Sequence, residues 1–364
     1  MNTPRTTPAQ ERPTGDAPGV TLVDCDVHPM FAPAEAVNSY LSDASRARLE
    51  LLGYSNQRLR TRYWSAHYGW AGGARVDAHP AEGESALERL RSQLLDAYGV
   101  DYGILNGDIP YAGGPELAAD SARASNEYLL EHWLDPEPRL LGSILVPWDH
   151  PDLAVGEIER RAGEGRWVQV LMPGEAMEPL GARKYRPIYE AATAHGLPLA
   201  THIGFYDPHH GTGWPSYTFE RHLGFAHTTR RQLLSMVCEG VFDAVPGVRV
   251  VMVEGGVSWA ASLRWALDSA FALLGEEARL ERRPSEYLDE FVWFTTQPIE
   301  EPDDPEDLLR AIEHGRLEDR LLFSTDYPHW DFDSPTQALP RALPTQLRQR
   351  ILAGNACALY GLPR

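Results

Sequence analysis

Two aspartates and a histidine alternate along a short stretch near the start of the chain. The stretch, VDCDVH at residues 23–28, has the pattern of a buried strand. Side chains two positions apart lie on the same face of a strand, so Asp24, Asp26 and His28 share one face. Burying three ionisable groups on one face costs free energy unless something binds them. A bound cation would make the arrangement tolerable.

Polar residues that could help to hold a cation follow three later apolar runs. His202 ends one run, Glu254 follows another, and Asp326 and His329 follow the last. A lone His or Asp at such a position is more often a hydrogen-bonded structural residue or a helix cap. If the runs converge, however, two imidazoles and several carboxylates form a site for a divalent metal ion with room for water. The agreement of four strand ends therefore predicts a metal site.

The elements that would position these residues are apolar runs that alternate with helical patterns. Several runs are continuous, as expected for strands covered on both faces. The repeated alternation predicts a (β/α)8 TIM barrel, in which the carboxyl ends of all strands meet. An open doubly wound sheet is the alternative, but no GxGxxG follows the first strand. The expected strands are 21–25, 102–106, 141–146, 167–171, 198–202, 249–253, 292–295 and 321–325. One expected helix starts at a capping box, Ser85–Glu88. The other expected helices lie at 114–133, 151–163, 184–195, 220–240, 259–278, 304–315 and 335–352.

Two insertions and a tail interrupt the regular spacing. Residues 30–84 separate the first strand from its helix, and residues 203–219 follow the fifth strand. Long loops after barrel strands usually lie over the active site. Residues 1–18 contain Thr, Pro and Arg without an apolar segment, which predicts a disordered tail and not a signal peptide. Residues 19–364 then form a single domain.

The composition excludes several classes of partner. The formal net charge of -19 argues against nucleic acid, whose phosphates need a basic surface. The sequence contains no run of 18 apolar residues, so no membrane span is expected. Three cysteines without a CxxC pair fit a reducing cytoplasm. An anionic substrate would need a local basic pocket, and Arg58 and Arg62 of the first insertion are candidates to bind a carboxylate there. A solvated loop or a subunit contact is the alternative for that insertion.

Five segments of the chain resemble a known family. VDCDVHP, THIG, VMVEGG, FSTDYPHWD and GNACALYGL occur in the order and spacing of the amidohydrolase-related metalloenzymes. The nearest branch contains 2-amino-3-carboxymuconate-6-semialdehyde decarboxylase and γ-resorcylate decarboxylase. The resemblance covers residues 20–362 and implies a metal-containing TIM barrel. It implies metal ligands at Asp26, His28, His202 and Asp326, where Asp26 replaces the first histidine of the family's His-x-His motif, and Glu254 replaces the histidine that commonly precedes Gly-Gly.

The expected function is metal-dependent chemistry on a small cyclic or carboxylated organic molecule. The resemblance fits hydrolysis and non-oxidative decarboxylation equally. In hydrolysis Asp326 would accept the proton of a metal-bound water, and Glu254 or His222 would assist the leaving group. His329 would orient a ligand or contact the substrate. Fe(II)-dependent oxygen chemistry and a non-catalytic partner-binding barrel are the alternative functions.

One divalent metal ion per subunit is expected. Zn is favoured, and Mn and Fe(II) are the alternatives, because two histidines with carboxylates also occur in iron oxygenases. We further expect a cytoplasmic homodimer or higher homo-oligomer whose partner is a small-molecule substrate, with neither nucleic acid nor membrane.

Overall fold

The structure of the protein is a computed structural model. It describes residues 19–30, 34–52, 73–107, 114–174, 176, 178–203 and 217–363. Arg58, Arg62, the predicted tail at 1–18 and most of the second insertion lie outside the described residues. Predictions about these segments therefore stay predictions.

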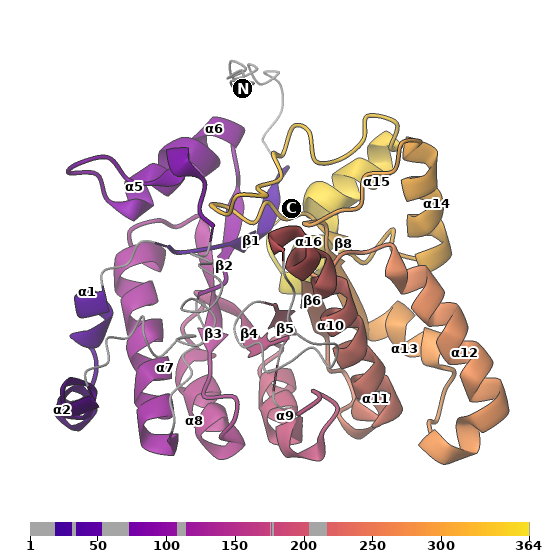
Figure 1. Cartoon of the computed structure of the whole chain (residues 1–364), viewed down its shortest axis with the longest axis horizontal. Helices are drawn as coiled ribbons and strands as arrows, with labels where there is room; N and C mark the ends of the chain where they lie inside the picture. The colour runs from indigo at the N-terminus through magenta and orange to yellow at the C-terminus, as the bar shows by residue number, and fades with distance from the viewer. Residues whose placement is uncertain are drawn as a thin grey trace.

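Eight parallel strands form one sheet whose spatial order is the order of the chain. Backbone hydrogen bonds also join the last strand region to the first, since Cys25 N donates to Phe323 O (2.9 Å) and His28 N donates to Tyr327 O (2.7 Å). The sheet is thereby closed into a barrel with helices around it (Figure 1), which confirms the predicted (β/α)8 fold. The strands are β1 (Val23–Val27), β2 (Tyr102–Leu105), β3 (Leu140–Leu145), β4 (Trp167–Pro173), β5 (Leu199–His202), β6 (Val250–Val253), β7 (Val292–Thr295) and β8 (Leu321–Leu322).

The predicted helices occur near their expected positions, with one exception at the C-terminus. The structure also contains helices that the patterns did not predict, at Ala34–Asn38, Asp43–Leu52, Val241–Ala244 and Pro284–Phe291. The capping box forms, because Ser85 Oγ accepts from Glu88 N (3.2 Å) and Glu88 Oε2 accepts from Ser85 N (2.8 Å). No helix of the described residues is both long and apolar enough to cross a membrane. The helices are α1 (Ala34–Asn38), α2 (Asp43–Leu52), α5 (Ala86–Leu90), α6 (Asp96–Tyr98), α7 (Pro115–Leu129), α8 (Pro151–Arg161), α9 (Arg186–Ala194), α10 (Thr218–Cys238), α11 (Val241–Ala244), α12 (Trp259–Ala278), α13 (Pro284–Phe291), α14 (Pro305–Gly315), α15 (Thr345–Gln349) and α16 (Asn355–Tyr360).

The prediction of a helix at 335–352 is wrong in its start and its end. The helix begins at Thr345 and continues through a π-helical turn, Arg350–Gly354, to Tyr360. Pro340 and Pro344 lack the N–H that a helix interior requires, so the helix starts only after Pro344. Within this helix, Asn355 donates its side-chain amide to the carbonyls of Glu318 and Leu321, which ties the last helix to the start of β8.

The hydrophobic core fills the layer between the strands and the surrounding helices. Every residue of β3, β5, β6 and β7 is buried, as expected for strands that are covered on both faces. Gly142 lets β3 pass close to its neighbour, because a Cβ there would lie 2.6 Å from the Trp167 ring and 2.9 Å from Leu134. The core therefore depends on a missing side chain at this position.

We expect Gly142→Ala to lower the free energy of unfolding by about 1–3 kcal/mol, because the added methyl group overpacks a filled region. Gly156→Ala is the matched control. Position 156 lies on the exposed side of α8, and a Cβ there meets no described atom within 4 Å. That change should leave stability equal or raise it, since alanine favours a helix more than glycine does. Chemical denaturation of both variants measures the difference, and equal stabilities would contradict the packing argument.

Candidate metal centre

Four of the strand-end residues meet at one end of the barrel. Asp26 and His28 at the end of β1, His202 at the end of β5 and Glu254 after β6 each offer a ligand atom, and these atoms all lie within 4.8 Å of one another. Asp26 Oδ1 is 3.3 Å from His28 Nε2, and Asp26 Oδ2 is 3.4 Å from His202 Nε2. His202 Nε2 is 3.1 Å from Glu254 Oε2. All four side chains are buried, so the predicted convergence occurs.

Asp326 joins this cluster from the loop after β8. Its Oδ1 lies 2.9 Å from His28 Nε2 and 2.6 Å from His329 Nδ1. It also groups with Glu254 and Asp331 within the same 4.8 Å limit. The sequence-based ligand set named Asp326 and left Glu254 open between ligand and acid. The geometry places both carboxylates beside the two histidines, so either can complete the ligand set.

Glu254 and Asp326 share an unusual backbone conformation. Their φ angles are 58° and 59°, in the left-handed region that residues with a Cβ rarely adopt. The conformation is held by hydrogen bonds, from Glu254 N to Thr295 Oγ1 (3.0 Å) and from Asp326 N to Asp26 O (3.1 Å). Left-handed backbone at a non-glycine residue costs on the order of 1 kcal/mol and concentrates at functional sites. Both strained positions aim a carboxylate at the same cluster.

The glycines that follow Glu254 are needed for packing. A Cβ at Gly255 would lie 2.5 Å from Thr229, and one at Gly256, whose φ is +70°, would lie 2.9 Å from Glu300 Oε1. Glu300 in turn accepts hydrogen bonds from Val257 N and Ser258 N just before α12. The Gly-Gly pair thus lets the chain leave β6 under neighbouring side chains.

His202 has a defined tautomer in this arrangement. Its Nδ1 lies 2.6 Å from the backbone oxygen of Ile203, so Nδ1–H donates to that carbonyl. The lone pair of the neutral ring is then on Nε2, which faces the carboxylates of Asp26 and Glu254. A histidine prepared in this way is suited to binding a metal ion through Nε2.

The carboxyl groups of Glu254 and Asp326 have pKa values shifted in opposite directions. Burial, together with the charges of Asp326 and Asp26, raises the pKa of Glu254 well above its usual range. Burial also disfavours the charged form of Asp326, but His329 and His28 outweigh it and hold that pKa below its usual range. Divergent pKa values in adjacent carboxyl groups separate a proton donor from a group that stays ionised.

Asp24, the first member of the alternating stretch, does not belong to the cluster. Its Oδ1 accepts from Thr325 N (3.0 Å) and its Oδ2 accepts from Thr325 Oγ1 (2.6 Å). Burial raises the pKa of Asp24 to about 7. The expectation that one cation balances all three groups is therefore wrong for Asp24, which instead links β1 to the segment after β8.

His222 reaches the cluster only through another residue. His222 Nε2 lies 2.7 Å from Asp331 Oδ2, and Gln297 Nε2 donates to the same oxygen (2.8 Å). Asp331 offers a ligand atom within 4.8 Å of those of Glu254 and Asp326. Asp331 was not among the site residues predicted from the sequence, although it closes the segment FSTDYPHWD that carries the family resemblance.

The described end of the first insertion lies at the cluster end of the barrel. Ala74 forms an antiparallel bridge with His329, and Arg75 N donates to Pro328 O (2.9 Å). The Arg75 guanidinium forms an ion pair with Asp77 of the same insertion (2.6 Å). It also lies over the ring of Phe332, which follows β8. The predicted substrate contacts Arg58 and Arg62 lie outside the described residues.

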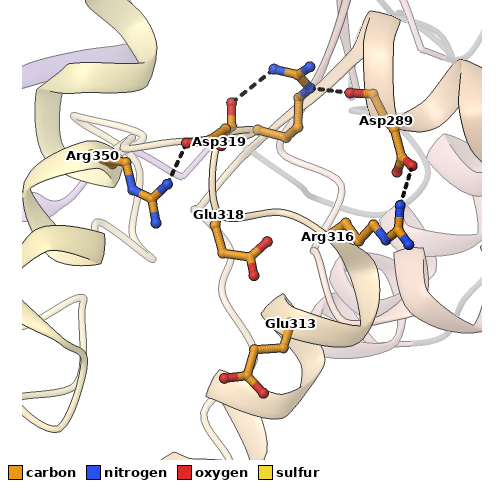
Figure 2. Close-up of a pocket in the computed structure, with 7 residues that line it drawn as sticks. Asp289, Glu313, Arg316, Glu318, Asp319 and Arg350 are labelled. Carbon is orange, nitrogen blue, oxygen red and sulfur yellow. Dashed lines mark hydrogen bonds and ion pairs between the residues drawn. The ribbon is translucent and has the colours of Figure 1, made fainter.

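A second group of charged residues lines a pocket around the segment that precedes β8 (Figure 2). Arg316 pairs with Asp289 (3.1 Å) and Arg350 pairs with Asp319 (2.6 Å). Residues before a strand lie at its amino end, whereas barrel enzymes place their active sites at the carboxyl ends. This pocket is therefore separate from the cluster around Asp26.

Comparison with known proteins assigns the family. The family model described as Amidohydrolase matches residues 23–362, and the chain belongs to that family. This confirms the predicted family and, with it, the predicted class of metal-dependent hydrolase or decarboxylase on a TIM barrel.

Several proteins that the chain resembles are decarboxylases. The chain is 25% identical to the gamma-resorcylate decarboxylase of Polaromonas sp. over 300 residues, which covers 76% of this chain and 88% of the relative. It is 27% identical to the enzyme of that name from Rhodococcus jostii over 301 residues, with the same coverage of 76% and 88%. The crystal structure of a dihydroxybenzoic acid decarboxylase from Polaromonas sp. with bound manganese and 2-nitroresorcinol superposes with a TM-score of 0.66 at 22% identity, covering 94% of this chain and 98% of that one.

The raised pKa of Asp333, which lies near Asp331, predicts how the stability of the protein depends on pH. Burial, with Glu301 and Asp331 nearby, raises the pKa of Asp333 to about 7 from a usual value of 3.8. The folded state therefore holds this proton more tightly than the unfolded state, so the contribution of Asp333 to stability is complete below pH 3.8 and is lost as the pH rises toward 7. We expect Asp333→Asn to gain stability relative to the wild type between pH 5 and pH 8.

Thermal unfolding at several pH values measures this difference. Asp152→Asn, at an exposed position of α8, reports the effect of removing a carboxylate elsewhere. A constant difference between Asp333→Asn and the wild type over this range would contradict the assignment.

Proposed function

We propose that this protein is a divalent-metal-dependent decarboxylase of a small aromatic carboxylate, acting without oxidation. The observation that carries the proposal is the cluster of Asp26, His28, His202, Glu254 and Asp326 at the carboxyl ends of the barrel strands. The relatives named gamma-resorcylate decarboxylase support the reaction and the aromatic substrate. The manganese of the solved relative supports a divalent ion.

The residues of the cluster fit a divalent cation. Asp26 Oδ2 and Asp326 Oδ2 are buried and accept no hydrogen bond from any described residue. Buried polar atoms of this kind cost free energy unless they are bound. The surplus of buried carboxylates over cationic side chains gives the same indication, because a divalent ion would offset their mutual repulsion.

The donor set suits more than one metal. Zn, the metal expected from the sequence, accepts histidine and carboxylate ligands. The carboxylate share of the site and the relative with manganese favour Mn²⁺. Elemental analysis of protein purified without added metal decides between them, and predominant iron with oxygen uptake would instead support the oxygen-dependent alternative.

Decarboxylation requires the ring carbon to exchange carbon dioxide for a proton. The bond from this carbon to the carboxylate breaks, its electron pair stays on the carbon, and a proton takes the vacated position. A divalent ion held by the cluster would supply Lewis acidity toward the oxygens of the substrate. The protein must supply an acid beside the same carbon, and the cluster offers candidates for that role.

We assign the acid to Glu254 and the fourth ligand to Asp326. The raised pKa of Glu254 favours the protonated carboxyl group that an acid needs. His329 and His28 favour the ionised form of Asp326 that a ligand needs. Asp331 and His222 form a hydrogen-bonded pair next to Glu254, which is suited to returning a proton from the direction of solvent. His329, at the edge of the cluster, is assigned to substrate contact together with Arg58 and Arg62.

The proposal extends to assembly and location. The exposed side chains of Trp265, Leu273 and Leu274 on α12 support a homo-oligomer. The three cysteines of the protein are free thiols, which supports a location in the cytoplasm.

Carbon dioxide release tests the reaction. The purified protein, supplied with Mn²⁺ or Zn²⁺, is incubated with hydroxylated benzoates and separately with ester and lactone substrates. We expect release of carbon dioxide and formation of the corresponding phenol from at least one benzoate. Hydrolysis of an ester or lactone without decarboxylation of any benzoate would overturn the proposal in favour of a hydrolase.

Glu254→Gln and Asp326→Asn should have different effects. We expect Glu254→Gln to keep its metal and to lower kcat by about 10²–10⁴-fold, because it removes a general acid. We expect Asp326→Asn to lose metal. Glu300→Gln is the matched control, since Glu300 only accepts backbone hydrogen bonds next to the same loop. It should lower the Tm and leave metal content and turnover unchanged.

Elemental analysis and steady-state kinetics of the three variants give the answer. Loss of metal in Glu254→Gln would make Glu254 a ligand. Normal metal and normal turnover in that variant would refute its assignment as the acid.

Removal of the metal should destabilise the protein. A ligand that binds only the folded state adds about 2.7 kcal/mol when its concentration is one hundred times its Kd. Without the ion, the buried carboxylates also repel one another. We therefore expect a chelator to lower the Tm and added Mn²⁺ or Zn²⁺ to restore it. An unchanged Tm in a protein shown to have lost its metal would contradict this expectation.

A further inference from the structure

A chain of buried polar side chains crosses the barrel and ends at Asp26. Asn106 after β2, Ser143 on β3 and Gln169 on β4 have no exposed surface. None of them belongs to the metal cluster, and the proposed reaction does not use them. Amide and hydroxyl groups in a core cost free energy unless their hydrogen bonds are made. Here the three side chains make those hydrogen bonds with one another and with residues at each end of the row.

One end of this polar chain is the first candidate metal ligand. Asn106 Nδ2 donates to Asp26 Oδ1 (2.8 Å) and to the Cys25 carbonyl oxygen (3.3 Å). Ser143 Oγ donates to Asn106 Oδ1 (2.6 Å), and Gln169 Nε2 donates to Asn106 Oδ1 (3.1 Å) and to Ser143 Oγ (2.9 Å). At the other end, the Tyr360 hydroxyl of α16 donates to Gln169 Oε1 (2.8 Å).

The direction of these hydrogen bonds is fixed by chemistry. The Asp26 carboxylate and the Cys25 carbonyl only accept, so Asn106 must turn its amide nitrogen toward them. Its oxygen then faces Ser143 and Gln169, which must both donate. The remaining oxygen of Gln169 needs a donor, and the Tyr360 hydroxyl supplies it. Every donor in the chain therefore points toward Asp26.

This direction leaves the second oxygen of Asp26 available. Oδ1 is occupied by Asn106. Oδ2 is buried, accepts no hydrogen bond from a described residue, and lies 3.4 Å from His202 Nε2. A carboxylate held by one oxygen presents the other in a fixed orientation, and partners that orient a ligand in this way contribute to metal affinity.

We propose that Asn106 is a positioning residue that orients Asp26 toward the metal ion, and that Gln169 and the Tyr360 hydroxyl set the orientation of Asn106. The inference rests on the proposed function, because the ion is the one assigned to the cluster. It links the packing of the C-terminal helix to the affinity of the metal site through hydrogen bonds inside the barrel.

The test measures Mn²⁺ affinity in protein variants. Purified protein loaded with Mn²⁺ is titrated with a chelator, and bound Mn²⁺ is followed by electron paramagnetic resonance. Asn106→Asp keeps the shape of the side chain but replaces the donor with an oxygen facing Asp26. We expect this change to weaken Mn²⁺ binding about 10–100-fold. Tyr360→Phe removes only the last donor and should weaken binding by a smaller factor.

Two matched controls separate positioning from general destabilisation. Asn126 is equally buried, and its amide nitrogen donates to the Leu145 carbonyl (2.9 Å) and to Glu157 (2.6 Å) outside the polar chain. Tyr189 is buried and its hydroxyl donates to the Leu180 carbonyl (2.6 Å). Asn126→Asp and Tyr189→Phe should lower the Tm and leave Mn²⁺ affinity at the wild-type value.

The outcomes distinguish this inference from the proposed function. Wild-type Mn²⁺ affinity in folded Asn106→Asp would overturn the role of Asn106. If Asn106→Asp does not fold, Tyr360→Phe decides, and wild-type affinity in that variant overturns the inference. Equal losses of affinity in the control variants would also overturn it, because they would show a general effect of destabilisation. A wild-type protein that binds neither Mn²⁺ nor Zn²⁺ would instead overturn the proposed function.

Discussion

The closure of the barrel between β1 and the segment after β8 is the constraint on which the site depends. Backbone hydrogen bonds from Cys25 to Phe323 and from His28 to Tyr327 bring together residues separated by nearly the whole chain. The buried pair of Asp24 and Thr325 strengthens the same seam. Because the seam is fixed, Asp326 lies beside His28, and the carboxylates of both segments share one space.

Electrostatics then makes this space chemically distinctive. Asp26, Glu254 and Asp326 are buried next to one another, and two of them sit on strained left-handed backbone. A fold selected for stability alone would replace such groups, since buried carboxylates repel one another and pay a desolvation cost. Their position around two histidines supports a site organised around a divalent cation.

The barrel interior supports this site with polar and not only apolar packing. Hydrogen bonds from Asn106 and Ser143 connect β1, β2 and β3, while the apolar side chains of the same strands form the core. An interior of this kind is both a source of stability and a scaffold for Asp26, the proposed ligand. The helix that ends at Tyr360 belongs to the same scaffold, although it lies far along the chain from β1.

Apolar runs and strand ends are local patterns, so the residue order was enough to predict the eight strands, most of the longer helices and the convergence of Asp26, His28, His202, Glu254 and Asp326. Which oxygen faces which nitrogen depends on the folded chain. The left-handed torsions at Glu254 and Asp326 are set by partners such as Thr295 and are invisible in the residue order. For the same reason, the binding of Asp24 to Thr325 and the proximity of Asp331 could not be predicted, since such contacts depend on strand register and loop geometry.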